Sequence, residues 1–243
     1  MSATFTVARR ELGAYFTSPV ATVFIVVFLV LQGALTFNGG SFFESNQANL
    51  APFFAFLPWV LVLLVPAITM RLWAEERRMG TVELLLSLPI RDGAAVLGKF
   101  IAAWIFCAVA IVLTFPIVIT VNLLGTPDNG PIIAGYIGAL LVAGAFLAIG
   151  STASALTKNQ VIAFVLALVV CFVFAAASYP LVTDFLGQNA PAAAGVAVRI
   201  AVIARFQDFT RGIISLRDVI FFASFIGFFL FLNTVIIEAR KAA

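Results

Sequence analysis

Charged residues are scarce in this sequence, and histidine is absent. Of the 243 residues, 10% are charged and 63% are hydrophobic, whereas a soluble domain is roughly half apolar and a quarter charged. This composition predicts an integral membrane protein. The lack of histidine argues against haem, zinc-hydrolase and imidazole proton-relay chemistry, because such sites usually recruit imidazole.

Cysteine is also rare. Cys107 and Cys171 each lie inside an apolar run, which predicts buried thiols rather than a disulfide framework. The runs hold no ionisable residue well inside them, which weighs against an ion-coupled transporter, a charged channel filter and a membrane-embedded lipid-modifying enzyme. Gln32, Asn122 and Asn233 lie near the ends of runs, where we expect interfacial positions.

Long uninterrupted apolar runs are the main feature of the sequence. A transmembrane helix needs about 20 such residues, whereas a β-barrel would show alternating segments of about ten. The expected fold is therefore an all-α polytopic membrane protein with six transmembrane helices. The expected spans are residues 20–37, 52–70, 94–124, 131–156, 161–181 and 219–237. Pro58, Pro66 and Pro116 should kink or locally unwind their helices.

The distribution of basic residues predicts the orientation, because cytoplasmic loops are enriched in Lys and Arg. With both termini in the cytosol, ten of the 14 basic residues lie on the cytosolic side. These ten are Arg9, Arg10, Arg71, Arg77, Arg78, Arg91, Lys99, Lys158, Arg240 and Lys241. The outer side holds Arg199, Arg205, Arg211 and Arg217.

Residues 4–17 have the pattern of an amphipathic surface helix. Phe5, Ala8, Leu12, Tyr15 and Phe16 fall on one face at helical spacing, and Arg9 and Arg10 would lie near anionic headgroups. The competing interpretation is an irregular cytosolic tail.

The loop between the second and third runs, residues 71–99, is the most informative segment. Glu75, Glu76, Arg77 and Arg78 precede Gly80 and Thr81, and an apolar octet then follows over residues 82–89. The octet is too short to span a membrane. Its leucines need a covering surface, either the ends of the chain's own spans or a groove in a soluble partner that Glu75–Arg78 and Glu83 would border. The octet contains Leu84, Leu85, Leu86 and Leu88 and ends at Pro89.

The pattern EERRMGTVELLLSLPI resembles the loop between the first two conserved spans of ABC type-2 transporter permeases. It is most similar to the gliding-motility and nitrous-oxide-reductase-maturation branch. The segments ARRELGAYFTSPVA and FQDFTRGIISLRDVIFF resemble the same branch. The matching positions are Glu75, Glu76, Arg77, Arg78, Gly80, Thr81, Glu83, Leu84, Leu85, Leu86, Leu88 and Pro89.

The resemblance implies a single permease domain over residues 1–243 with no catalytic, cofactor or metal site of its own. A separate ATP-binding cassette ATPase would bind ATP and Mg²⁺, and the chain indeed lacks a GxxxxGK(S/T) phosphate loop. By this resemblance, residues 4–17 are an elbow helix, residues 75–89 form the coupling loop with a coupling helix over 81–88, and residues 183–218 form short outer helices. In that last segment Val196, Ile200 and Ile203 recur at helical spacing and Arg199 and Arg205 could snorkel; the competing interpretation is a disordered loop.

The expected function is therefore the permease subunit of an ATP-driven exporter in a bacterial cytoplasmic membrane. Its expected partners are the ATPase, a second permease chain (a homodimer), membrane lipid and a periplasmic auxiliary protein, with no nucleic acid. The alternative is a non-transporting membrane anchor that transmits force within a motility or maturation complex.

Overall fold

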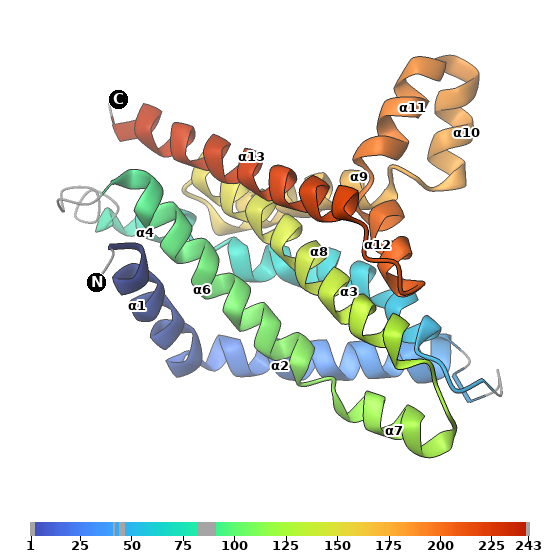
Figure 1. The fold of residues 1–243 in the computed structure, drawn as a ribbon. Coiled ribbons are helices and arrows are strands. Elements are labelled where there is room, and N and C mark those ends of the chain that lie inside the picture. Colours follow the sequence, from blue (N-terminus) through green and yellow to red (C-terminus); the bar gives the residue numbers. More distant parts are fainter. Residues whose placement is uncertain (1–2, 41, 44–46, 82–90, 242–243) are drawn as a thin grey trace.

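The chain folds into a bundle of helices (Figure 1). The computed structural model describes residues 3–40, 42–43, 47–81 and 91–241, and these contain no β-strand. The helices are α1 (Ala3–Thr17), α2 (Pro19–Ala34), the π-helix η1 (Leu35–Gly39), α3 (Ala51–Thr69), α4 (Ala74–Met79), α6 (Asp92–Val112), α7 (Pro116–Leu124), α8 (Asn129–Leu156), α9 (Gln160–Ala176), α10 (Pro180–Asn189), α11 (Pro191–Ile200), α12 (Val202–Thr210) and α13 (Leu216–Lys241).

Five helical segments of the described chain are long and apolar enough to cross a membrane. They are Ala21–Gly39, Ala51–Met79, Asp92–Leu124, Asn129–Leu156 and Leu216–Arg240. A sixth crossing is present if α9 and α10 are counted as one broken span. The predicted all-α polytopic fold is confirmed, with five or six crossings.

The expected continuous span over residues 161–181 is broken in the structure. Helix α9 ends at Ala176, and α10 begins at Pro180 with its axis bent by 79°. Tyr179 has an extended backbone, as expected for a residue that precedes proline. The 17 residues of α9 extend about 25 Å at 1.5 Å per residue, so the break lies close to the end of the crossing.

Proline has different effects at its three predicted positions. At Pro116 the prediction is confirmed, because α6 ends at Val112 and Pro116 begins the separate helix α7. Helix α3, in contrast, continues through both Pro58 and Pro66, so the helix does not unwind at either residue.

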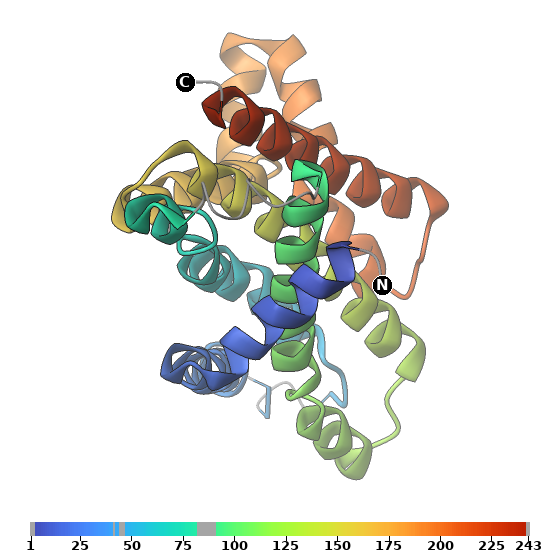
Figure 2. The same ribbon diagram turned by 90° about the vertical axis from the view of Figure 1, so that its left-hand side faces the viewer.

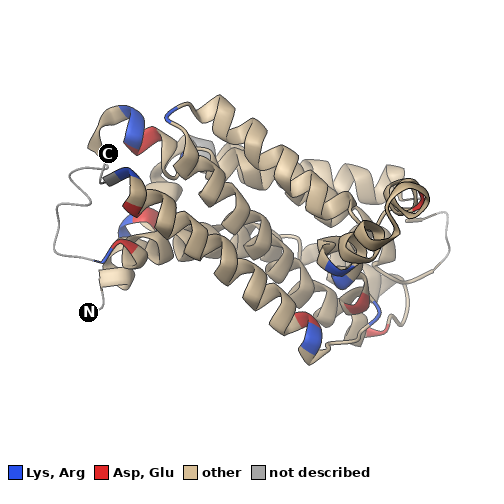
Figure 3. Ribbon diagram, turned by 90° about the horizontal axis from the view of Figure 1, so that it is seen from above, with Lys and Arg blue, Asp and Glu red and all other residues tan. Residues whose placement is uncertain are grey.

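The two ends of the bundle carry the charged side chains. The first and last described residues lie at the same end as α4, whereas α7, α10 and α12 lie at the other end (Figure 1). We call the end with the chain termini and α4 the terminal end, and the end with α7, α10 and α12 the far end. Seen from above, Lys, Arg, Asp and Glu gather at both ends and the middle is free of them (Figure 3), as expected for a membrane-crossing bundle.

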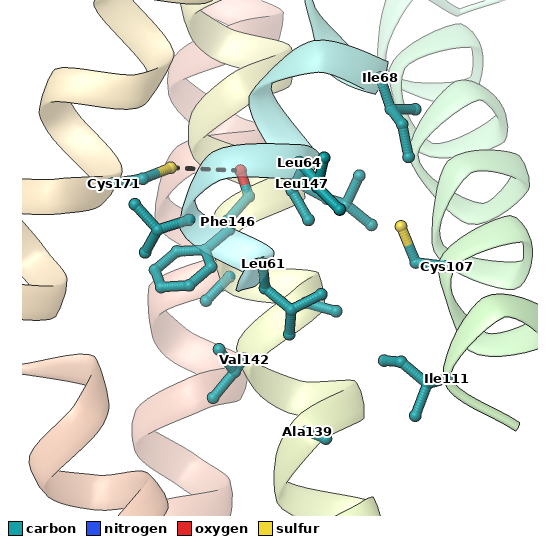
Figure 4. Close-up of a cluster of buried hydrophobic side chains, with 14 of the residues drawn as sticks. Leu61, Leu64, Ile68, Cys107, Ile111, Ala139, Val142, Phe146, Leu147 and Cys171 are labelled. Carbon is teal, nitrogen blue, oxygen red and sulfur yellow. Dashed lines mark hydrogen bonds between the residues drawn. The ribbon is translucent and has the colours of Figure 1, made fainter. Parts of the chain in front are cut away.

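Helix α8 forms the centre of the bundle and packs against α3, α6, α9, α12 and α13. In the core, α3 side chains face those of α6 and α8 (Figure 4). Cys107 and Cys171 are both buried free thiols, which confirms the prediction. The Cys171 Sγ lies 3.8 Å from the Phe146 carbonyl oxygen, to which it donates its S–H (Figure 4).

Candidate coupling site at the terminal end

The predicted coupling loop is partly described. Glu83, Leu84, Leu85, Leu86, Leu88 and Pro89 lie outside the described residues, whereas Glu75, Glu76, Arg77 and Arg78 form most of the short helix α4. Helix α4 ends at Gly80, whose φ of +73° is readily adopted only by glycine. The Gly80 N–H donates to the Glu76 carbonyl oxygen, and the Thr81 hydroxyl donates to the same oxygen over 3.3 Å. These two hydrogen bonds close the last turn of α4.

Hydrogen bonds to α8 fix the corner between α3 and α4. The backbone N–H groups of Trp73 and Ala74 each donate to the Ser154 hydroxyl oxygen over 3.1 Å, and that hydroxyl donates to the Met70 carbonyl over 3.0 Å. The Trp73 indole N–H donates to the Ser151 hydroxyl over 3.2 Å. Backbone donors at the start of a helix have no partner within it, and here the Ser154 side chain of α8 accepts two of them.

The hydrogen bonds around Ser151 also reach α13. The Asn233 side-chain amide donates to Ser151 over 2.6 Å, and Asn233 is fully buried. The expected interfacial position of Asn233 is therefore wrong, and so is that of Gln32, which is 1% exposed and donates to the Phe53 carbonyl over 2.8 Å. Both amides are held inside the bundle because neighbouring helices supply hydrogen-bond partners. Asn122, in contrast, is exposed.

Lys99 connects three helices at this end. Its ammonium nitrogen lies 2.7 Å from Glu76 Oε1 on α4 and 3.2 Å from Glu11 Oε1 on α1. The same nitrogen lies 5.2 Å from the Trp73 ring centroid. We call Glu11, Glu76 and Lys99 the Lys99 clamp.

The expectation that Lys99 belongs to the loop over residues 71–99 is wrong. Lys99 lies inside α6 and is 1% exposed. Two carboxylates and an aromatic face replace the water that would otherwise solvate the ammonium group, so its burial is tolerated.

The charges of the clamp also act on Glu11. Burial of this carboxyl favours its neutral form, but the charge of Lys99 and the hydrogen bonds from Arg10 and Lys99 outweigh burial and hold the pKa of Glu11 below its usual value. The guanidinium of Arg10 lies 2.8 Å from Glu11 and 3.9 Å from Glu76. Glu11 is therefore a carboxylate at neutral pH.

The basic residues of α4 differ in their surroundings. Arg77 donates to the Ala155 carbonyl oxygen over 2.6 Å, and Arg240 donates to the adjacent Leu156 carbonyl over 2.8 Å. The last carbonyls of α8 have no partner within that helix, so both side chains cap its end. Arg78 is exposed at the surface.

The helix predicted over residues 4–17 is present as α1, which crosses α6 at the terminal end (Figure 2). Its buried residues are Val7 and Ala8, and Val7 lies against Gly98 of α6, where an added Cβ would lie 2.8 Å from Val7. Glycine at position 98 lets the two helices approach closely.

The expected apolar face of α1 is divided between two environments. Tyr15 stacks on Phe106 of α6 with ring centroids 5.1 Å apart, and Leu12 is half-buried. Phe5 and Phe16 remain 54% and 51% exposed. The side chains of Arg9 and Arg10 are exposed too. Helix α1 is thus attached to the bundle along one face and exposes its phenylalanines.

Sequence reasoning missed Glu11, Trp73 and Lys99 as members of this site. One signal was available. Lys99 is a lone cation within the expected apolar run 94–124, and a charge in such a run requires a partner.

Among the residues that the structure describes, no three His, Cys, Asp or Glu side chains lie close enough together to hold a metal ion.

Comparison with known proteins gives one family. The profile of the ABC-2 family transporter proteins matches residues 5–226, from the start of α1 into α13. No curated protein matches the chain significantly. Members of this family are typically non-catalytic membrane subunits that work with ATPase subunits. The chain therefore belongs to the ABC-2 transporter family and is a multi-pass membrane component of that kind.

Proposed function

We propose that this chain is the permease subunit of an ATP-driven exporter in a bacterial cytoplasmic membrane. It pairs with a second copy of itself and with a separate ATPase that binds ATP and Mg²⁺. The terminal end faces the cytosol, because the basic side chains of Arg9, Arg10, Arg71, Arg77 and Arg78 belong to it.

The observation that carries this proposal is the attachment of α4 to the bundle. The chain enters segment 82–90 directly from α4, whose corner is bonded to α8 and whose Glu76 is bonded through Lys99 to α6 and α1. A displacement of the loop would therefore move α4 as a rigid body against three other helices. This is the behaviour required of an element that transmits ATPase closure to the spans.

In this proposal the residues that contact the ATPase are those that follow α4. Glu83 and the leucines of segment 82–89 enter a groove on the ATPase, and the exposed Arg78 lies at its rim. Glu75 and Glu76 have internal roles instead, because Glu75 pairs with Arg71 over 2.8 Å and Glu76 belongs to the Lys99 clamp.

A second candidate function is the non-transporting anchor of a motility or maturation complex, as in the branch that the sequence resembles. The helices α10 and α11 favour it, because they contain no buried residue. Leu181 is 83% exposed and Phe185 is 66% exposed at this end. An external auxiliary protein would cover these side chains.

Co-purification tests the coupling site. The tagged chain is solubilised from its native membrane, and the vanadate-sensitive ATP hydrolysis that remains bound to it is measured. We expect Glu83→Lys combined with Leu85→Asp to remove most of this activity, because the changes place unpaired charges in the ATPase groove. Retention of the full activity by this variant would refute the proposed contact.

The matched control places the same changes at the far end. Asp184→Lys combined with Leu181→Asp alters two exposed residues of α10, and the bound ATPase activity should stay at the wild-type level. In the anchor function, this far-end variant would instead lose an external protein from the purified complex while keeping the ATPase.

A further inference from the structure

Two arginine side chains from distant parts of the chain meet at the carboxyl end of α8. Arg77 of α4 donates to the Ala155 carbonyl oxygen over 2.6 Å, and Arg240 of α13 donates to the Leu156 carbonyl oxygen over 2.8 Å. These carbonyls are consecutive, and the charge of Arg240 acts on Arg77. The fold therefore holds two like charges close together, and we call them the arginine pair.

The described residues do not supply a carboxylate to balance the arginine pair. Among them, no carboxylate oxygen lies within 4.0 Å of either guanidinium group. Glu75 is bonded to Arg71 and Glu76 to Lys99, and Glu238 lines a separate hollow between α1, α6 and α13. The end of α8 contributes about half a negative charge against two full positive charges. A site with this excess of one sign attracts an anion.

A third cation lies next to the pair, at the depth of the lipid headgroups. Lys158 follows the last residue of α8 by two positions and is exposed. The 28 residues of α8 extend about 42 Å at 1.5 Å per residue. A bilayer with its headgroups is about 40–45 Å thick, so the last carbonyls of α8 and the cations around them lie among the headgroups.

The surface beside these cations is apolar. Leu156 precedes Lys158 by two positions and Val161 follows it by three, and both side chains are exposed. Further exposed apolar side chains continue along α9, namely Ile162, Val165, Leu166 and Val169. A ligand that meets both surfaces carries a negative charge at headgroup depth and apolar chains below it, which is the chemistry of an anionic phospholipid.

We propose that Arg77, Lys158 and Arg240 bind the headgroup of an anionic phospholipid, such as phosphatidylglycerol. The phosphate lies between the two guanidinium groups, because each keeps further N–H donors beside the one bonded to α8. Lys158 adds its charge at the edge of the site, and the acyl chains lie along α9.

Native mass spectrometry of the purified, delipidated full chain tests this site. The chain is offered phosphatidylglycerol or phosphatidylcholine with identical acyl chains, and the fraction that retains one lipid is measured over a range of lipid concentrations. Phosphatidylcholine also has a phosphate, but its choline cancels the net charge. We expect phosphatidylglycerol to bind at least about tenfold more tightly, since each basic residue near an anionic lipid contributes about fivefold. Equal retention of the two lipids would overturn the proposal.

Substitutions that remove one charge test the location. Lys158→Gln alters an exposed residue outside the helices, and Arg240→Gln alters an exposed residue in the last turn of α13. Each should weaken phosphatidylglycerol binding about fivefold and leave phosphatidylcholine binding unchanged. Arg211→Gln is the matched control, because it removes the same charge from an exposed residue after α12, and it should bind phosphatidylglycerol as the wild type does.

Three results would reject the site. The first is wild-type binding of phosphatidylglycerol by a folded Arg240→Gln variant. The second is displacement of phosphatidylglycerol by inorganic phosphate at constant ionic strength, because the site would then take free phosphate without the acyl chains. The third is a Lys158→Gln and Arg240→Gln double variant that keeps the lipid but loses the ATP hydrolysis bound to the purified complex, because the cations would then face an acidic surface of the ATPase.

Discussion

At the scale of single residues, Lys99 is a charged side chain buried at the terminal end. Removal of an ammonium ion from water costs several kcal/mol even after relaxation, and Lys99 is 1% exposed. Glu11 and Glu76 together offset this cost, with Trp73 contributing its ring face. Because two carboxylates share one cation, the cation is the member whose loss is most damaging.

We therefore expect Lys99→Met to destabilise the chain by about 3 kcal/mol, the lower end of the range for a buried pair broken on one side. The two carboxylates would then be left with the exposed guanidinium of Arg10, which lies 2.8 Å from Glu11 and 3.9 Å from Glu76. Thermal unfolding of the detergent-solubilised chain measures the effect. Arg71→Met is the control: its pair with Glu75 is 38% and 29% exposed, so the loss should stay below about 1 kcal/mol. Equal effects of the two substitutions would contradict the clamp.

The clamp also predicts a pH dependence. The pKa of Glu11 is lowered in the folded chain, so its charged form stabilises the fold. This contribution is complete above the pKa of an unfolded glutamate, about 4.3, and is lost as the pH falls through the lower folded value. The stability difference between wild type and Glu11→Gln should be constant near neutral pH and shrink below about pH 4. A stability difference that grows on acidification would contradict a lowered pKa of Glu11 in the folded chain.

At the scale of elements, the crossing of α1 over α6 depends on Gly98. An added Cβ there would lie 2.8 Å from Val7 and 2.9 Å from the Thr4 carbonyl oxygen. We expect Gly98→Ala to move α1 away from α6 and to cost about 1–3 kcal/mol, as overpacking does. Distances between spin labels on α1 and α6 report the displacement.

Gly13→Ala is the matched control for this crossing. Gly13 lies on α1 with open space around it, and alanine favours a helix over glycine by up to about 1 kcal/mol. The control should therefore stabilise the chain slightly and leave the label distances unchanged. A stable Gly98→Ala chain with wild-type distances would show that the close approach is unimportant.

The elements themselves were largely predictable, because long apolar runs and amphipathic spacing are local properties. The helix over residues 4–17 and the break at Pro116 follow from such patterns. Pro180 was missed as a break because the apolar run continues through it to Leu181. Helix α3 continues through Pro58 and Pro66, an outcome that the sequence pattern did not indicate.

Contacts between distant residues were not predictable. Lys99 meets Glu11 across 88 positions and Glu76 across 23, and no local pattern encodes such a pairing. The same holds for Arg205, expected to snorkel, which instead pairs with the buried Asp218 over 3.2 Å. An ion pair removes the need to reach water, so the length of a side chain alone does not determine its position.

At the scale of the whole molecule, α8 joins the two ends. Its last turns accept the hydrogen bonds of Trp73, Ala74 and Arg77. Toward the far end the same helix packs against α12, whose Phe206 and Phe209 are buried. A rigid helix held at both ends can transmit a displacement of α4 to α12. This step rests on the proposed coupling function.

Gly138→Ala tests this connection at the far end. An added Cβ at Gly138 would lie 2.8 Å from the Cβ of Phe209 and 3.0 Å from the Phe206 ring. Because the Phe209 Cβ is fixed to the backbone, α12 must move away from α8. We expect faster amide hydrogen exchange over Val202–Thr210 in this variant, with unchanged ATPase binding. Gly227→Ala, which meets no neighbouring atom, should leave exchange as in the wild type.

Nucleotide trapping then distinguishes transmission from mere loosening. In the wild-type complex, vanadate trapping of the ATPase should change amide exchange in both α4 and α12, because α8 links them. In Gly138→Ala the change in α4 should persist and the change in α12 should disappear, since α12 no longer follows α8. If α12 still responds to vanadate in this variant, the displacement reaches the far end by another helix, such as α13 through Asn233 and Ser151. Substituting Asn233→Leu in the same background would then abolish the response.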